Sequence, residues 1–186
     1  MVEITDFVPH SPVPPAVVEA YRGRVPDEIV EVWERYGYGT FGEGFVRVID
    51  PALYEEQLGD RIGKTQGDGI AIPVMTTGLG DLITWEPSIG ALVLLMFRSH
   101  RVRGLGRAHS FFTLLRMDGV EHLEEDLEWD LFPQAVAAQG PPAYDECFVH
   151  VPLPVMGGPG TVDTLRKRQT LTAIQVMVEL QGAIGH

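Results

Sequence analysis

The clearest periodic pattern of apolar residues in this chain is helical and covers residues 26–36. Pro26 suits the first turn of a helix, and Asp27 and Glu28 favour the positive end of its dipole. Apolar residues recur at i, i+3, i+4 and i+7 and form one face: Ile29, Val32, Trp33 and Tyr36. Shorter patterns predict helices over 16–21 and 51–58.

Short apolar runs in the middle of the chain predict β-strands. The runs are rich in branched and aromatic residues and cover residues 45–49, 70–75, 82–85, 91–97 and 111–117. Short turns between them favour antiparallel pairing, because parallel strands need long crossovers. We therefore expect an α+β fold, with an antiparallel sheet of about five strands packed by helices.

The ends of the chain and one central segment follow different patterns. Four prolines within residues 9–15 predict an extended lead-in, and the polar, glycine-rich residues 59–69 predict a loop. The acidic segment 118–139 contains apolar residues near helical spacing, although Pro133 interrupts it. A boundary is expected near residues 139–142, and a last helix over 165–181 completes a small C-terminal helical part.

Composition limits the classes of protein to which the chain can belong. Its 186 residues fit one domain, or one domain with a small appendage, and 45% apolar with 22% charged residues is typical of a globular protein. The net charge of −12 argues against nucleic-acid binding, because contact with phosphates needs a basic surface. It is compatible with a basic partner, or simply with good solubility.

The single cysteine and the hydropathy of the chain indicate a cytoplasmic protein. Cys147 has no second cysteine with which to form a disulfide. The N-terminus lacks the basic and apolar regions of a signal peptide. The longest apolar run covers residues 91–97, far short of the roughly 20 residues that a membrane helix needs.

No pattern in the sequence predicts a catalytic, metal or cofactor site. His122 and Glu125 share an i, i+3 spacing, which is more typical of a solvated helix face than of a metal site. Cys147 lacks any nucleophile signature and is expected to lie in the core. The glycine pairs at 78–80 and 104–106 do not complete a phosphate-binding loop.

Two clusters of charged residues are the remaining candidates for a binding site. Each cluster can be a solvated surface, with the two clusters paired to one another. Alternatively the acidic cluster binds a basic partner, such as the DNA-binding cleft of a nuclease, or the arginine cluster binds nucleic acid. The basic cluster is Arg98, Arg101, Arg103 and Arg107, and the acidic cluster is Asp118, Glu121, Glu124, Glu125, Asp126, Glu128 and Asp130.

Several short motifs, in this order, resemble a known family. They are Trp33-Glu34-Arg35-Tyr36-Gly37 with Gly39, Asp50-Pro51, Gly78-Leu79-Gly80-Asp81-Leu82, and the segment from Tyr144 to Gly158. Together they resemble the GAD-like domain of bacterial type VI nuclease-immunity proteins, followed by its usual short C-terminal domain. The resemblance implies a GAD-like domain over residues 25–117 and an immunity-type domain over 118–186, packed as one unit. Residues 1–24 match no motif of the family and are expected to be an N-terminal extension.

The resemblance also implies a function. Such a protein is a cytoplasmic antitoxin rather than an enzyme, and it binds and blocks a cognate secreted nuclease toxin, with no cofactor, membrane or direct nucleic-acid partner. We expect Asp81 and the seven residues of the acidic cluster to contact the toxin. Two alternatives remain open: an enzyme with a cryptic carboxylate site, and a regulatory protein-interaction domain. The sequence does not determine the oligomeric state.

Overall fold

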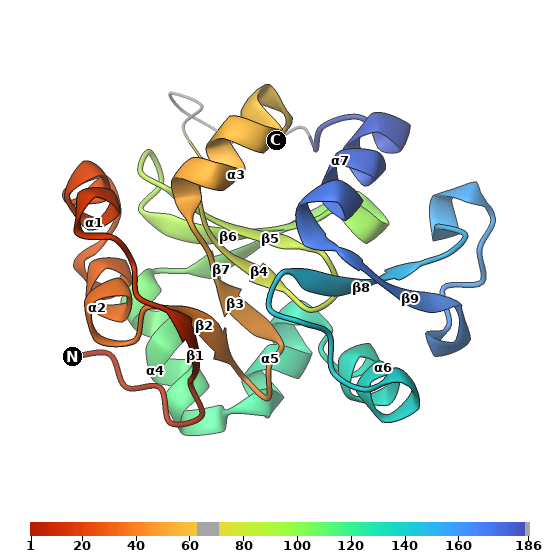
Figure 1. Ribbon diagram of the computed structural model, residues 1–186, viewed down its shortest axis with the longest axis horizontal. Helices are drawn as coiled ribbons and strands as arrows, with labels where there is room; N and C mark the ends of the chain where they lie inside the picture. The colour runs from red at the N-terminus through yellow and green to blue at the C-terminus, as the bar shows by residue number, and fades with distance from the viewer. Residues whose placement is uncertain (63–70, 185–186) are drawn as a thin grey trace.

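The computed structural model describes residues 1–62 and 71–184, and its centre is a seven-stranded sheet (Figure 1). Every strand pairs antiparallel with the next one in the chain, so the strand order is simply β1 to β7. Short connections allow this meander. The strands are β1 (Val8–Ser11), β2 (Tyr38–Phe41), β3 (Val46–Val48), β4 (Ile72–Thr77), β5 (Leu82–Glu86), β6 (Ala91–Met96) and β7 (Arg101–Gly106).

Helices cover both faces of this sheet, and each face has its own apolar core. In Figure 1, α3 and α7 lie above the sheet and α4 and α5 lie below it. The larger core packs against α1 (Pro15–Tyr21), α2 (Asp27–Arg35), α4 (Ala108–Asp118), α5 (Val120–Leu127) and α6 (Leu131–Gln139). The second core packs against α3 (Pro51–Leu58) and α7 (Thr170–Gln181).

Strand β6 shows why the sequence contains an unbroken apolar run at this point. Leu92, Leu94 and Met96 belong to the larger core. Val93 and Leu95 point to the opposite face and belong to the second core. A strand that is buried on both faces needs apolar residues at every position rather than at every second one.

The first 24 residues are built into the body of the protein. β1 pairs with β2, and α1 contributes Val18 and Tyr21 to the larger core. Val2 and Ile4 are also buried there. The residues that the sequence marked as an extension therefore form one edge of the main sheet.

The C-terminal part adds a second, small sheet. β8 (Glu146–His150) and β9 (Leu165–Gln169) pair antiparallel, and α7 follows directly. Phe148 in β8 donates its N–H to the carbonyl of Gly78, in the turn between β4 and β5, at 2.7 Å. This bond and the burial of Phe148 in the larger core attach the small sheet to the large one.

The predicted strand count was too low. The expected sheet of about five strands has seven, and a two-stranded sheet accompanies it. The predicted helices over 26–36 and 51–58 and the strands over 45–49, 82–85 and 91–97 are confirmed within a few residues. β4 confirms the strand predicted over 70–75, although Ile70 lies outside the described residues. The predicted loop over 59–69 begins as a 3₁₀ turn at Gly59–Ile62, and the rest of it also lies outside them.

Two predicted elements have a different secondary structure. Residues 111–117, expected as a strand, lie within helix α4. Apolar residues fill nearly every position there, so the run matches both periods; Phe111, Phe112 and Leu115 face the core while Leu114 and Met117 stay exposed. The predicted last helix over 165–181 is strand β9 up to Gln169 and helix α7 only from Thr170. The side chain of Gln169 accepts the N–H of Thr172 and so fixes the start of the helix.

Candidate partner-binding site

Five carboxylates from three distant segments surround one groove of about 490 Å³ on the surface. The N-terminal residues, the turn between β2 and β3, and the junction of α4 with α5 form its walls. Asp6 accepts the N–H of Glu43 at 2.8 Å and so joins the first two segments. The carboxylates of this acidic groove are Glu3, Asp6, Glu43, Asp118 and Glu121, and Arg116 is the only guanidinium that lines it in the described part of the chain.

Helix α5 extends this acidic surface. Leu123 and Leu127 are fully buried, so the opposite face of the helix points outward. Glu121, Glu124 and Glu125 lie on that outward face at i, i+3 and i+4 and are exposed. Among the described residues, no ion pair involves these three side chains, Asp118 or Asp130. Five of the seven residues of the predicted acidic cluster are therefore exposed and form no ion pair within the described part of the chain.

The other two members of the cluster are paired with the arginine cluster. Asp126 accepts a hydrogen bond from Arg103 at 2.7 Å, and Glu128 accepts one from Arg98 at 2.9 Å and another from Arg101. The interpretation in which the two charge clusters pair with each other is thus correct for these residues. It also leaves little of the arginine cluster for nucleic acid, because Arg98, Arg101 and Arg103 are already neutralised.

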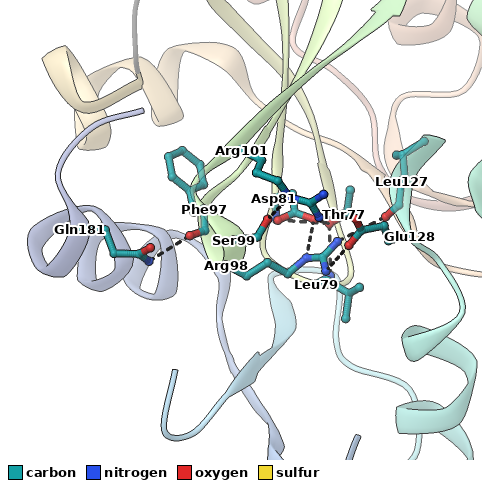
Figure 2. A network of polar contacts seen from close by, with 10 residues as sticks. All are labelled: Thr77, Leu79, Asp81, Phe97, Arg98, Ser99, Arg101, Leu127, Glu128 and Gln181. Atoms are coloured by element: carbon teal, nitrogen blue, oxygen red, sulfur yellow. Dashed lines mark hydrogen bonds and ion pairs between the residues drawn. The ribbon is translucent and has the colours of Figure 1, made fainter. Parts of the chain in front are cut away.

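Asp81 lies at the centre of the buried part of this network (Figure 2). Its carboxylate is fully buried and accepts the Nε–H of Arg98 at 3.1 Å and the hydroxyl of Thr77 at 3.2 Å. The Thr77 hydroxyl oxygen in turn accepts the N–H groups of Leu79 and Asp81, each at 3.2 Å. Arg98, only 9% exposed, therefore joins the β4–β5 turn to the residue that follows α5.

The pKa values in this network follow from burial and pairing. Burial raises the pKa of Asp81 above its ordinary value, and the neighbouring Arg98 opposes that rise. For Arg98, burial acts to lower the pKa, but Asp81 and Glu128 outweigh it and hold the pKa above its usual value. Burial acts to raise the pKa of Glu128, and Arg98 and Arg101 bring it below the usual value. The pairing thus favours the charged form of all three groups, and for Arg98 and Glu128 it outweighs the effect of burial on the pKa.

The position of Asp81 changes its expected role. A fully buried carboxylate cannot touch a partner, so the predicted contact role does not fit Asp81 in this structure. The turn that carries it is packed against the C-terminal part: a Cβ atom on Gly78 would lie 2.2 Å from the ring of Phe132 in α6. Gly80 has a φ of 77°, which favours glycine. The motif therefore joins the two parts of the chain.

A second groove, of about 510 Å³, lies beside the buried network at this junction. His100 and Glu128, two of the three non-glycine residues with positive φ in the described chain, line it. His150 also lines it, and burial together with Arg98 lowers the pKa of that histidine. We call it the junction groove; it is lined by Arg98, Ser99, His100, Glu128, Leu131, His150, Pro154, Val155, Gly160 and Gln181.

The remaining candidates for chemistry occupy structural positions. His122 is buried, and its Nδ1 lies 3.3 Å from Asp126, one turn further along α5. No cluster of three or more metal-ligating side chains occurs within residues 1–62 and 71–184. Cys147 is fully buried, as expected, and burial raises its pKa to about 12, so it is a poor nucleophile. The glycines at 104–106 lie in strand β7 rather than in a loop.

Sequence reasoning missed three carboxylates of the acidic groove. Glu3, Asp6 and Glu43 are single charges in different segments, and only the pairing of β1 with β2 brings them near α5. The pattern gave no sign of this pairing, because Pro9 and Pro12 led us to expect an extended lead-in. Within the described residues, no helix has the length and apolar character required to cross a membrane.

A solved structure has the same fold. The crystal structure of Atu4351 from Agrobacterium tumefaciens matches with a TM-score of 0.73 at 18% sequence identity. The match covers 93% of this chain and 85% of that one. At this identity the similarity concerns the fold alone. Among curated proteins, none matches the sequence significantly.

Family models match two adjacent segments of the chain. The GAD-like domain matches residues 2–98, which include β1 to β6 and Asp81. The C-terminal domain of the type VI secretion system immunity protein Tdi1 matches residues 107–180, from the start of α4 nearly to the end of α7. Arg98 and Glu128, which form a partly buried ion pair, therefore belong to different domains. The chain is a member of the GAD-like family and carries, after its GAD-like domain, the C-terminal domain of type VI immunity proteins.

Proposed function

We propose that this protein is a cytoplasmic immunity protein that binds a cognate nuclease toxin of the type VI secretion system and blocks its active site. The match to an immunity-protein domain over residues 107–180 supports a toxin as the partner. That the toxin is a nuclease is a more specific proposal, and it depends on the charge of the surface described below. Inhibition by blocking the active site needs no catalytic residue of this chain.

The acidic groove, together with the outer face of α5, is the observation that carries the proposal. Its carboxylates are exposed, and the described residues provide few cations to neutralise them. A nuclease must hold a polyanion, so its substrate cleft is basic. An acidic surface that carries free charges can occupy such a cleft, exclude the substrate and accelerate association.

The buried network gives this surface a fixed position. Arg98 bonds both the carbonyl of Leu127, at 3.5 Å, and the carboxylate of Glu128. It therefore holds the C-terminal end of α5 against the GAD-like domain. A surface that is ordered before binding loses less conformational entropy in the complex, which favours tight inhibition.

The experiment is a binding titration with a catalytically inactive form of the toxin encoded beside this gene. Replacing Glu121, Glu124 and Glu125 by lysine should weaken binding at low salt by about 10- to 100-fold, mostly through slower association. Glu56→Lys is the matched control, because Glu56 is an exposed helical glutamate on α3, on the other side of the sheet. If the wild-type protein does not bind the toxin, the proposed function is wrong. If the triple variant binds as tightly as the wild-type protein, the acidic surface is not the contact with the toxin.

The structure gives less support to the two alternatives. A cryptic carboxylate enzyme would gather carboxylates of raised pKa in one pocket. Among the described residues, two carboxylates have a raised pKa, Asp81 and Glu86; both are fully buried, and neither lines the acidic groove or the junction groove. A regulatory interaction domain would share the binding surfaces described here and would differ only in its partner.

A further inference from the structure

The connection between β8 and β9, residues 151–164, presents apolar side chains to solvent. Val155 is 58% exposed and Met156 is 63% exposed. None of the residues from Val151 to Val162 is charged, in a chain of which 22% is charged. Figure 1 shows this connection projecting from the body beside β8 and β9. We call residues 151–164 the arm.

The arm is ordered by its own hydrogen bonds. Met156 and Gly158 both donate their N–H groups to the carbonyl of Leu153, at 2.9 and 3.1 Å. Leu153 is buried in the second core and anchors the base of this turn. Apolar side chains on an ordered, projecting turn are typical of binding surfaces, because little entropy is lost when they enter a pocket.

Strand β9 carries Arg166 and Arg168, which we call the basic strip, on one face and Lys167 on the other. These three cations follow the arm in the chain: Arg166, Lys167 and Arg168. Their side chains bond the backbone carbonyls of Asp163, Pro141 and Lys167 respectively, at 2.8 to 2.9 Å, rather than carboxylates of the described chain. By contrast, Arg98, Arg101 and Arg103 all pair with carboxylates. In a protein of net charge −12, these cations are available to acidic groups on a partner.

We propose that the arm and its basic strip form a second contact with the toxin, and that they fit an apolar pocket bordered by carboxylates. This inference rests on the proposed function. Charge complementarity argues for such a pocket, because exposed cations beside apolar side chains are best matched by carboxylates at the border of an apolar pocket. Val155 and Met156 enter the pocket, and Arg166 and Arg168 face its acidic border.

The two contacts engage opposite charges on the toxin. The acidic groove faces the basic surface that binds DNA, while the basic strip faces carboxylates. Nucleic acid does not fit the arm, because uncharged apolar side chains contribute nothing to phosphate contact and the net charge is unfavourable. An anionic membrane would meet the same net charge.

Calorimetric titration of the inactive toxin tests the proposal with two variants, Val155→Ser/Met156→Ser and Arg166→Glu/Arg168→Glu. Each should weaken binding by about tenfold or more, as expected for central contacts of an interface. Ile89→Ser, on the β5–β6 turn, and Arg107→Glu, at the start of α4, are matched controls, because both residues are exposed. The controls should change the affinity by less than about twofold.

The outcomes separate the two proposals. If the wild-type protein binds and both arm variants bind equally well, the arm is not a contact, and the proposed function stands. If the wild-type protein does not bind, the proposed function fails, and this inference fails with it. Binding of the wild-type protein to vesicles of anionic phospholipid that the serine variant loses would assign the arm to a membrane and overturn the inference.

Thermal melting of each variant shows whether it folds. A second measurement does not depend on substitutions. Hydrogen exchange at the amides of Val155, Met156 and Gly157 should slow when the toxin binds, and unchanged exchange there would also overturn the proposal.

Discussion

Replacing Arg98 by methionine should destabilise the protein far more than replacing Arg101, although both residues pair with Glu128. Methionine keeps much of the length of the side chain and removes the charge. In Arg98→Met, Asp81 loses its only cationic partner in the described chain while remaining fully buried. In Arg101→Met, Glu128 keeps its bond to Arg98 and stays partly exposed.

The expected magnitudes follow from burial. Removing one partner of a buried ion pair typically costs about 3–5 kcal/mol, because the other charge is left without compensation. Asp81 already has one oxygen atom, Oδ1, with no hydrogen-bond partner among the described residues, and Thr77 alone would remain at Oδ2. Arg101 is 58% exposed, and exposed pairs contribute about 0–1 kcal/mol.

Urea unfolding followed by tryptophan fluorescence is a suitable assay, since Trp129 follows Glu128 directly. The loss of stability caused by Arg98→Met, which we call its stability deficit, should depend on pH. Burial raises the pKa of Asp81 in the folded state, and the loss of Arg98 raises it further. Stability is then retained below the pKa of the unfolded chain and falls as the pH rises through the folded-state pKa. The deficit should therefore be largest at neutral pH and smaller in acid.

A double-mutant comparison separates the unpaired charge from the lost packing. Asp81→Asn in the Arg98→Met background should recover part of the lost stability, because the amide carries no charge. The reasoning is refuted if Arg98→Met and Arg101→Met differ by less than about 1 kcal/mol at neutral pH. It is also refuted if Asp81→Asn lowers the stability of the Arg98→Met protein further.

Two further predictions concern other buried positions. Burial raises the pKa of Glu86 to about 7, so its stabilising protonated form is present at low pH and is lost as the pH rises through that value. Glu86→Gln should therefore raise the free energy of unfolding by about 3 kcal/mol relative to wild type above about pH 8, and change it little near pH 4. Urea unfolding at both pH values would measure this difference. An equal effect at the two pH values would contradict the raised pKa of Glu86. Gly78→Ala should destabilise the protein by about 1–3 kcal/mol in the same assay, because its Cβ would lie 2.2 Å from the Phe132 ring, and a neutral effect would show that this contact can relax.

The elements that could be predicted from sequence are those in which the local pattern and the tertiary environment agree. The helix over 26–36 has one apolar face and one buried face, so its period was unambiguous. β7 was missed because it lies at the edge of the sheet, and its exposed residues, such as Arg101 and Arg103, carry no apolar signal. Residues 111–117 were assigned to a strand rather than a helix because α4 carries large apolar residues on its exposed face as well as on its buried face. The helical period of the buried residues is therefore hidden in the sequence.

The candidate site was predictable only where it is local. Glu121, Glu124 and Glu125 lie within one helix, so the density of acidic residues in the sequence was enough to identify them as candidates. Sequence could not tell that Asp81 is buried, because its burial is a matter of tertiary packing, in which Arg98 from the segment after β6 lies against it. Nor could it reveal Glu3, Asp6 and Glu43, since strand pairing rather than spacing brings those carboxylates to the groove.

The distribution of charge links the fold to the proposed function more closely than the net charge does. Arginines near the domain junction pair with Asp81, Asp126 and Glu128. They therefore stabilise the structure and do not neutralise the carboxylates of the acidic groove. The cations of β9 bond backbone carbonyls and pair with no carboxylate of the described residues. The C-terminal domain therefore contributes to both charged surfaces: Asp118 and Glu121 line the acidic groove together with carboxylates of the GAD-like domain, and Arg166 and Arg168 form the basic strip. A partner that fits both must carry the opposite arrangement, and raising the salt concentration should weaken both contacts together while leaving the buried junction intact.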